Sequence, residues 1–535
     1  MSGTRGKNGE AMIAAARQAP VDVDVAVVGA GPTGLLLAAE LAMRGLRVVV
    51  LERNVERPTF VRAFNLNSRS LEILDRRGIV DRFLAEGPKV PFTHFAALAE
   101  PLDLAGLDTD HPYVLGIPQT RTEALLEAHA LEQGAEIRWG HAVADIAQDD
   151  DGVTIELDVA AGDTAAGTSR RTLRTRWLVG CDGGRSTVRK RAGIGFPGTA
   201  ATRWALLGDV ELADPASLSF GNHQTSRGSV FVIPRPGYVR VITSEIVPPV
   251  NAESPVTLDA LRDAVAHVLG RDVALVRPRW LTRFSDAARL AERYRLGRVL
   301  LAGDAAHVHP PAGAQGLNVG LQDAFNLGWK LAAVARDGAA DELLDSYHDE
   351  RHAAGERLLT QTRAQAELGQ TDDRLAPVRG LVRDLARDTG VRRLLAEMVS
   401  GLDTRYAVAS PERMARQPML GRLAPNVALE VATRCTTLAA CLRQGRMVLV
   451  TRGTPSELVD AVAPLRDRLE VATIPDVPMQ SRWLDGVDAA LVRPDGHVAW
   501  LADGEGAVES LRASAERWLG VSTESAKLPG PLSRI

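Results

Sequence analysis

The pattern of apolar positions along the chain predicts an α/β protein. Short, mostly apolar runs, at 23–28, 177–180 and 299–302, are typical of parallel strands that are buried on both faces. Two of these runs are followed by stretches with apolar residues every three or four positions, which predict helices over 35–43 and from about Leu317 onwards. Ligands of open α/β sheets bind at the carboxyl ends of the strands, so we expect a functional site where these runs end.

Two further regions show different patterns. Within 203–283, short apolar runs such as GSVFVIP and YVRVITSEI predict antiparallel strands. After about Leu423, strands such as RMVLVTRG alternate with helical stretches, and RPDG at 493–496 has the residues of a tight hairpin turn. The charged stretch that begins at Asp372 is helical in parts and connects these regions.

A glycine-rich turn follows the first predicted strand. Gly29, Gly31 and Gly34 have GxGxxG spacing, which suits a tight turn, a close approach of the backbone to a pyrophosphate, and a helix packed against the strand. Glu52 stands at the tip of the next strand, where a carboxylate accepts from a ribose 2′-OH and repels a 2′-phosphate. The motif therefore predicts that the chain binds FAD or NAD rather than NADP, and it does not distinguish FAD from NAD. The alternative is an ordinary turn between a strand and a helix.

The segment LAGDAAHVHPPAGAQGLN, at 301–318, favours a flavin. Asp304 ends a predicted strand, Pro310 and Pro311 restrict the backbone, and glycines then let it lie flat against a ligand. The helix that follows would direct its first N–H groups and its positive dipole end towards that ligand, which suits the negative charge of a reduced flavin. The alternative is a strand that ends in Gly-Asp and a surface loop shaped by prolines.

Composition narrows the class of protein. With 535 residues, of which 45% are hydrophobic, the chain can bury several cores. Its net charge is −4 and charges of both signs are interspersed, which favours a small-molecule partner over nucleic acid or a membrane surface. The first twenty residues lack the pattern of a signal peptide, and no stretch approaches the ~18 apolar residues of a membrane span. We therefore expect a cytoplasmic protein.

Metal and dithiol chemistry are not expected. Cys181, Cys435 and Cys441 form no CxxC pair, which fits a reducing compartment without disulfides. His307 and His309 have no third ligand in view, so they do not predict a metal site.

Three motifs, taken in order, resemble those of the FAD-dependent aromatic hydroxylases. These are single-component flavoprotein monooxygenases with the fold of p-hydroxybenzoate hydroxylase, and the larger members act on aromatic polyketides, phenols and rifamycins. The motifs are GxGxxG at 29–34, LVGCDGGRSTVR at 178–189 and the Gly-Asp pair that ends at Asp304. The resemblance covers the chain from about Val21 onwards. It implies a Rossmann-like FAD-binding domain interleaved with an antiparallel-sheet substrate domain, and a thioredoxin-like C-terminal domain.

The predicted domain boundaries combine the pattern with this resemblance. The thioredoxin-like C-terminal domain has no CxxC pair, so we expect no thiol chemistry there. The predicted parts are a flexible tail (1–20), an FAD-binding domain (21–93, 113–200 and 286–390), a substrate-binding domain (94–112 and 201–285), a connector (391–422) and the thioredoxin-like domain (423–535).

The resemblance also implies the roles of individual residues. Asp304 would bind the ribityl hydroxyls, Pro311 would lie near the flavin C4a, and backbone N–H groups of Leu317 and Asn318 would meet the pyrimidine edge. Arg189 is implicated with the second motif, with a solvated helix charge as the alternative. The implied cofactor-binding residues are Gly29, Gly31, Gly34, Glu52, Arg53, Arg62, Gln119, Asp182, Asp304, Pro311, Gly316, Leu317 and Asn318. The sequence does not identify a catalytic base.

A substrate pocket is expected to draw on aromatic residues of the substrate domain. Arg203 and Arg240 are candidates for an orienting charge, although core aromatics and surface arginines are the alternative interpretation. The candidate aromatic residues are Phe92, Phe95, Trp204, Phe231 and Tyr238.

The activity that the resemblance implies is the insertion of one atom of O2 into a polycyclic aromatic, polyketide-type substrate. NADPH would reduce FAD during a transient visit, because the chain has only one GxGxxG motif, and oxygen would be transferred through a flavin C4a-hydroperoxide. Hydroxylation is favoured, and Baeyer–Villiger oxidation of a polyketide ketone is the alternative. A non-oxygenating flavoprotein is the alternative of another class, although the WxWxIP motif of flavin halogenases is missing. We expect a monomer or a homodimer.

Overall fold

The computed structural model describes residues 20–520, except for positions 97, 99, 161–167, 250, 252, 371, 433, 454, 476–481, 485, 503 and 505. The predicted flexible tail lies outside the described residues apart from Pro20, as does the last part of the predicted C-terminal domain, 521–535. None of the helices among the described residues is long and apolar enough to cross a membrane.

The strands of the largest sheet come from distant parts of the chain. Its order is β19-β20-β11-β1-β2-β8, and β10 and β9 continue from β11. The four central strands, β20, β11, β1 and β2, run parallel, so their carboxyl ends share one edge. The three predicted apolar runs are neighbouring strands of this sheet. The strands are β1 (Val23–Val28), β2 (Val48–Glu52), β8 (Glu136–Trp139), β9 (His141–Gln148), β10 (Val153–Ala160), β11 (Thr168–Gly180), β19 (Arg295–Leu296) and β20 (Val299–Leu301).

Three helices pack together beside this sheet. The helix α2 (Pro32–Ala42) contacts both α5 (Gln119–Glu132) and α8 (Gly316–Asp337). A methyl group at Gly328 of α8 would lie 2.5 Å from the Cβ atom of Glu40, so α8 and α2 approach closely at this point. The helix α8 is capped at its C-terminus by Gly338, which has a left-handed conformation.

The second sheet is antiparallel, as predicted, and has the order β14-β15-β16-β13-β17. The helix α7 (Leu258–Leu269) covers one face, where Leu206, Val230 and Val241 are buried. Because side chains alternate along a strand, Phe231, Arg235 and Arg240 belong to the opposite face. The strands are β13 (Trp204–Leu212), β14 (Gly221–Thr225), β15 (Gly228–Arg235), β16 (Tyr238–Ser244) and β17 (Leu275–Ser285).

The third sheet forms the C-terminal unit, in the order β23-β22-β25-β24-β26-β27. Only β24 and β25 pair in parallel among its described strands. The predicted hairpin joins β26 to β27, and Gly496 closes its turn with a φ of 83°. The elements are β22 (Ala428–Val431), β23 (Arg434–Thr437), α13 (Leu438–Cys441), β24 (Met447–Arg452), α14 (Ser456–Val462), β25 (Leu469–Ile474), β26 (Ala489–Val492), β27 (Val498–Leu501) and α15 (Ala507–Leu519).

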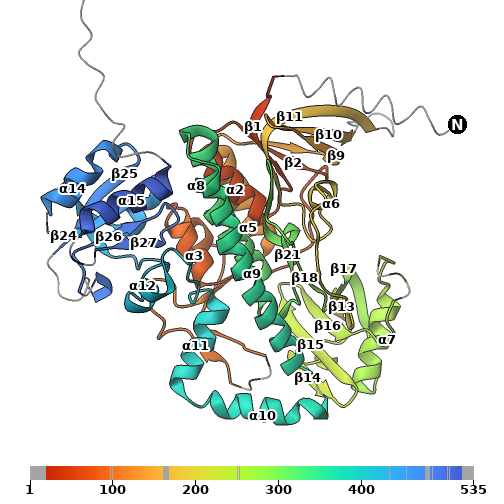
Figure 1. Cartoon of the computed structure of the whole chain (residues 1–535). Helices are drawn as coiled ribbons and strands as arrows, with labels where there is room; N and C mark the ends of the chain where they lie inside the picture. Colours follow the sequence, from red (N-terminus) through yellow and green to blue (C-terminus); the bar gives the residue numbers. More distant parts are fainter. Residues whose placement is uncertain are drawn as a thin grey trace, which may run out of the picture.

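The C-terminal unit packs against α8, on the side of this helix that faces away from the first sheet (Figure 1). Trp329 and Ala333 of α8 share an apolar core with the third sheet. From α8 the chain continues into the long helix α9 (Glu342–Leu368), which runs towards the second sheet, and returns through three connecting helices (Figure 1). These are α10 (Ala376–Leu385), α11 (Thr389–Ser400) and α12 (Pro411–Arg416).

Short elements complete the described chain. They are β3 (Asn65–Leu66), α3 (Ser68–Asp75), α4 (Val80–Leu84), β4 (Lys89–Val90), β5 (Phe92–Thr93), β6 (Leu102–Asp103), β7 (Val114–Gly116), α6 (Thr187–Arg191), β12 (Gly198–Thr199), β18 (Ala288–Leu290) and β21 (His307–Val308). The fold class is the one predicted from the sequence, a mixed α/β protein with an inserted antiparallel sheet and an α/β C-terminal unit.

Candidate functional site

Glu52 is fixed beside the glycine-rich turn. It is the last residue of β2, and its Oε2 accepts a hydrogen bond from the Ala30 N–H at 2.9 Å. Its Oε1 accepts from the backbone N–H and the side-chain amide of Asn54, at 3.0 and 2.7 Å. The carboxylate therefore lies at the carboxyl edge of the first sheet, as the motif predicts.

Of the three glycines in the glycine-rich turn, only Gly31 leaves room for a ligand. A methyl group at Gly34 would lie 2.0 Å from the carbonyl oxygen of Gly29, and one at Gly29 would lie 2.5 Å from that of Cys181. A methyl group at Gly31, by contrast, would meet no atom within 4 Å. No side chain caps α2, so its first N–H groups are available for a phosphate. The turn therefore fits the pyrophosphate of a dinucleotide.

Asp182 follows β11 at the same edge, but its carboxylate is used within the chain. Its Oδ1 accepts from the Ser186 hydroxyl at 2.5 Å, and its Oδ2 accepts from the Thr187 and Val188 N–H groups at 2.6 and 3.2 Å. It therefore satisfies the start of α6, and a direct contact between Asp182 and FAD stays a prediction.

Arg189 joins the second motif to the third. It is 4% exposed, which rules out the solvated helix charge that we considered as an alternative. Its guanidinium donates to the carbonyl oxygens of Ala305 and Gly184, at 2.8 and 2.9 Å. The side chain thus anchors the loop that carries Asp304.

Asp304 is the acidic residue of this edge that is free to bind a ligand. It is exposed, whereas its neighbours Gly303 and Ala305 are buried. Within the described part of the chain, its carboxylate makes no hydrogen bond or ion pair. Pro311, further along the same loop, is also exposed. An exposed, unpaired carboxylate beside a free helix N-terminus fits the hydroxyl groups of a ribityl chain.

The N-terminus of α8 faces this loop without a side-chain cap. The Asn318 side chain is directed elsewhere, because its Oδ1 accepts from the Asn67 N–H at 2.9 Å and from the Ser70 hydroxyl at 2.7 Å. The backbone N–H groups at Gly316, Leu317 and Asn318 therefore remain available for the edge of a flavin ring.

Three further cofactor predictions concern Arg53, Arg62 and Gln119. Arg53 and Arg62 are exposed. Gln119 begins α5, and its Oε1 accepts from the Ala63 N–H at 3.2 Å, so it ties the segment 61–64 to α5. Contacts between these residues and FAD stay predictions.

The residues predicted to contact the substrate separate into different environments. Phe95 is 5% exposed and packs in an apolar cluster with Leu102 and Val399, away from the second sheet. Arg203 pairs with Glu367 at 2.7 Å on the surface. Phe231 lies on the face of the second sheet opposite α7 and is 42% exposed. Phe92 is also exposed, and Trp204 and Tyr238 are half-buried.

Arg240 is a structural anchor rather than an unpaired charge. It is buried, and it donates two hydrogen bonds of 2.8 Å to the carboxylate of Asp209. It also donates to the carbonyl oxygens of Val61 and Arg62. Because its donors are occupied, Arg240 holds the segment 61–64 against the second sheet.

Arg235 is a candidate that the sequence interpretation missed. It lies on the same face of β15 as Phe231, and its guanidinium carbon stacks 3.4 Å from the ring centre of Phe64. Its Nε is buried and has no hydrogen-bond partner among the described residues. Burial and the nearby charge of Arg240 lower the pKa of Arg235. The alternation of side chains along GSVFVIPR could have indicated it, since it places both residues on one face.

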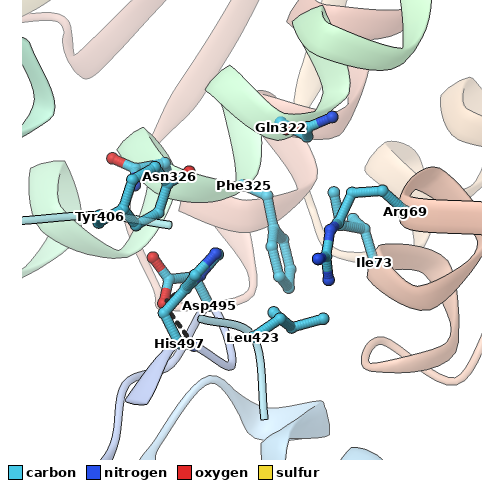
Figure 2. A pocket seen from close by; sticks show the side chains of 9 residues that line it. All are labelled: Arg69, Ile73, Gln322, Phe325, Asn326, Tyr406, Leu423, Asp495 and His497. Carbon is cyan, nitrogen blue, oxygen red and sulfur yellow. Dashed lines mark hydrogen bonds and ion pairs between the residues drawn. The ribbon is translucent and has the colours of Figure 1, made fainter. Parts of the chain in front are cut away.

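A small cavity lies between α3, α8 and the C-terminal hairpin (Figure 2). Its walls include Arg69, Gln322, Tyr406 and His497, and it encloses about 10 Å³. That is room for roughly one water molecule, so it is not a substrate site.

The glycine-rich turn, the free carboxylate and the uncapped α8 lie on one sheet edge, and together they define a flavin-binding α/β protein. Comparison with known protein families supports this assignment. Residues 22–362 match the family model of an FAD binding domain, and residues 417–522 match that of the C-terminal region of aromatic-ring hydroxylases.

The similar proteins match the chain over nearly its whole length. The 12-dehydrotetracycline 5-monooxygenase/anhydrotetracycline 6-monooxygenase of Streptomyces rimosus is 40% identical over 508 residues, which are 93% of this chain and 99% of the relative. The solved structure of an anhydrotetracycline hydroxylase from that species has a TM-score of 0.85 and 40% identity, and the match covers 94% of this chain and 99% of the other. A dialkyldecalin synthase of Streptomyces rugosporus is 37% identical over 93% of this chain and 98% of the relative.

The chain belongs to the family of FAD-dependent aromatic hydroxylases. The resemblance seen in its motifs is thereby confirmed, FAD is its cofactor, and the enzyme is a flavin monooxygenase with the fold of p-hydroxybenzoate hydroxylase.

Proposed function

We propose that this enzyme inserts one atom of O2 into a polycyclic aromatic, polyketide-type substrate, with NADPH as the electron donor and ring hydroxylation as the outcome. The observation that carries the proposal is the full-length similarity to an enzyme named for monooxygenation of anhydrotetracycline, at 40% identity. FAD, when bound, supplies the redox chemistry with O2, and the protein supplies position, charge and exclusion of water.

The first sheet positions the cofactor in this proposal. Glu52 would hold the adenosine ribose, and the N-terminus of α2 would hold the pyrophosphate at Gly31. Asp304 would bind the ribityl hydroxyls, and the N–H groups at the start of α8 would stabilise negative charge on the ring without rearrangement. The same residues thus serve both the binding and the reactivity of the cofactor.

The face of the second sheet opposite α7 would position the substrate. Cross-strand neighbours Phe231, Ile242 and Leu207 form an apolar row on the face opposite α7. Arg235 lies on the same face and offers a buried donor without a partner among the described residues. We propose that Arg235 binds a phenolic oxygen of the substrate and favours its phenolate form, which makes the ring electron-rich.

The experiment that tests this function is mass spectrometry of the products formed from polycyclic aromatics with NADPH under isotopically labelled O2. A gain of one labelled oxygen with the ring skeleton intact supports hydroxylation. A lactone or an opened ring indicates Baeyer–Villiger oxidation and contradicts the hydroxylation part of the proposal.

A product without labelled oxygen would contradict the function as a whole. The dialkyldecalin synthase among the similar proteins, 37% identical, gives that outcome a specific alternative, because its name describes a ring-forming reaction. Consumption of O2 and oxidation of NADPH that rise on addition of the aromatic compound separate the two functions directly.

A further inference from the structure

A buried carboxylate two turns into α8 holds the loop that carries Asp304. Asp323 is 0% exposed. Its Oδ2 accepts from the backbone N–H of Gly303 at 2.9 Å and lies 2.7 Å from Nε2 of His307. Gly303 and His307 lie on either side of Asp304 in the sequence, so Asp323 holds the chain on both sides of the exposed carboxylate, through the backbone at Gly303 and through the side chain at His307.

The charge of Asp323 is maintained by its second partner. Its Oδ1 accepts from Nε of Arg351 in α9 at 2.7 Å. Burial opposes the ionisation of Asp323, but Arg351 and His307 together hold its pKa below the ordinary value. Since an ionised carboxylate only accepts hydrogen bonds, Nε2 of His307 is the donor in this contact.

Arg351 is itself held in place from two directions. Its Nη1 donates to the Tyr406 hydroxyl at 3.1 Å, and its Nη2 donates to the carbonyl oxygen of Val319 at 3.3 Å. The Tyr406 ring lies 4.3 Å from the ring of His497, which follows the C-terminal hairpin turn. The loop at 303–308 is therefore connected through Asp323 and Arg351 to the C-terminal unit.

The same pair of helices contains a second buried carboxylate that does not contact this loop. Glu350 of α9 accepts from Arg493 at 2.6 Å and from Lys330 at 2.8 Å. It also accepts from the Asn326 amide at 2.7 Å. Glu350 thus shares the burial, the helices and the arginine pairing of Asp323, but not the contact with Gly303 and His307.

We propose that Asp323 is a positioning residue for FAD, which acts through Gly303 and His307 to hold Asp304 towards the ribityl chain. Removing the charge of Asp323 would free both sides of the loop, and the Asp304 carboxylate would lose its fixed direction. The proposal rests on the binding of FAD and not on the reaction or the substrate proposed above.

The experiment compares Asp323→Asn with the matched control Glu350→Gln. FAD is removed from each purified protein and titrated back, and binding is followed by the quenching of flavin fluorescence. Because a lost hydrogen bond to a charged group changes an equilibrium constant by roughly tenfold or more, we expect a Kd at least about tenfold higher for Asp323→Asn. We expect the Kd of Glu350→Gln to stay within about threefold of the wild type, although both variants unfold at lower temperatures.

A second pair of variants tests the contact through His307. Glutamine can donate from a position close to that of Nε2, so His307→Gln should retain the wild-type Kd and flavin absorption spectrum, whereas His307→Leu should raise the Kd as Asp323→Asn does. This pair decides the matter if Asp323→Asn does not fold. The proposal is overturned if Glu350→Gln weakens FAD binding as much as Asp323→Asn, or if His307→Leu binds FAD as the wild type does.

Discussion

Single carboxylates at one sheet edge have different tasks because they have different partners. Glu52 and Asp182 bond to the backbone near them, whereas Asp304 is exposed and unpaired within the described chain. An exposed residue without partners contributes little to the stability of the fold. Replacing Asp304 therefore tests the binding of the ligand, whereas replacing Asp182 tests the stability of the fold.

Asp304→Ala should yield a folded protein that lacks FAD. We expect the free energy of unfolding of the apoprotein to change by less than about 0.5 kcal/mol, because the side chain has no partner to lose. The ratio of flavin absorbance to protein absorbance after purification measures the cofactor content. A full yellow complement in this variant would contradict the ribityl contact.

Arg235→Met should weaken the binding of a phenolic substrate. Methionine retains apolar contact with Phe64 but removes the charge, so the KM should rise by about tenfold or more, as expected for a lost charge-assisted hydrogen bond. Steady-state oxidation of NADPH at varied substrate concentration measures it. Arg82→Met, which removes an exposed arginine paired with Glu132 at 2.8 Å, is the control and should leave the KM unchanged. Equal effects in both variants would exclude the role of Arg235.

At the scale of elements, the glycine-rich turn separates folding from binding. Gly34 packs against Gly29, so a side chain there displaces α2 from β1. Gly31 has an extended conformation, with φ −80° and ψ 177°, and faces open space. One turn thus contains a position that the fold requires to be glycine, Gly34, and a position that faces open space, Gly31, where we expect the ligand.

Gly31→Ala and Gly34→Ala should therefore fail in different ways. Gly31→Ala should unfold at the wild-type temperature as apoprotein and bind FAD at least about tenfold more weakly, because its methyl group occupies the space of the pyrophosphate. Gly34→Ala should lose several degrees of thermal stability or not accumulate in folded form. Apoprotein unfolding by circular dichroism, with FAD titration, distinguishes them. Unchanged FAD affinity in Gly31→Ala would show that no phosphate lies there.

Many of the helices, strands and turns could be predicted from the sequence. The parallel strands β1 and β20, and the last four residues of β11, are marked by short apolar runs, and Gly316 and Gly338 bound α8, so both patterns are local. Glu52 could be placed because it ends β2, and Asp304 because it follows β20. Contacts between distant segments could not be predicted, since neither the pairing of Arg240 with Asp209 nor the burial of Phe95 beside Val399 leaves a local signal.

At the scale of the whole molecule, buried charges attach the C-terminal unit to α8 and α9, the helices that pack beside the loop carrying Asp304. Arg493 in the hairpin turn pairs with Glu350 and with Asp495, and Asp495 accepts from the indole N–H of Trp329 at 3.1 Å. Burial opposes the ionisation of Glu350, but Arg493 and Lys330 lower its pKa to about 2. Breaking such a pair leaves an uncompensated buried charge, so we expect the C-terminal unit and α8 to unfold together.

This junction should make the stability of the protein sensitive to mild acid. Burial lowers the pKa of His497 to about 4, from an ordinary value of 6.5. The unfolded chain binds a proton on this residue between pH 6.5 and pH 4 that the folded chain does not bind, so stability falls as the pH drops through this window. We expect His497 to account for a loss of about 2 kcal/mol between pH 7.5 and pH 5.

His497→Phe retains the ring contact with Tyr406 and removes the titration, so the variant should lose less stability between these two pH values than the wild type. Denaturant unfolding at both values measures the difference. His94→Gln, at an exposed position, is the control and should retain the wild-type dependence. The same acid sensitivity in His497→Phe would contradict the assignment to this residue.

The measurement that tests the central claim most directly is a crystal structure of the enzyme with FAD bound. The account predicts the adenosine ribose within hydrogen-bonding distance of Glu52, the pyrophosphate at Gly31, the ribityl chain at Asp304 and the pyrimidine edge at the N-terminus of α8. A flavin bound elsewhere, or one whose ribityl chain makes no contact with Asp304, would contradict it.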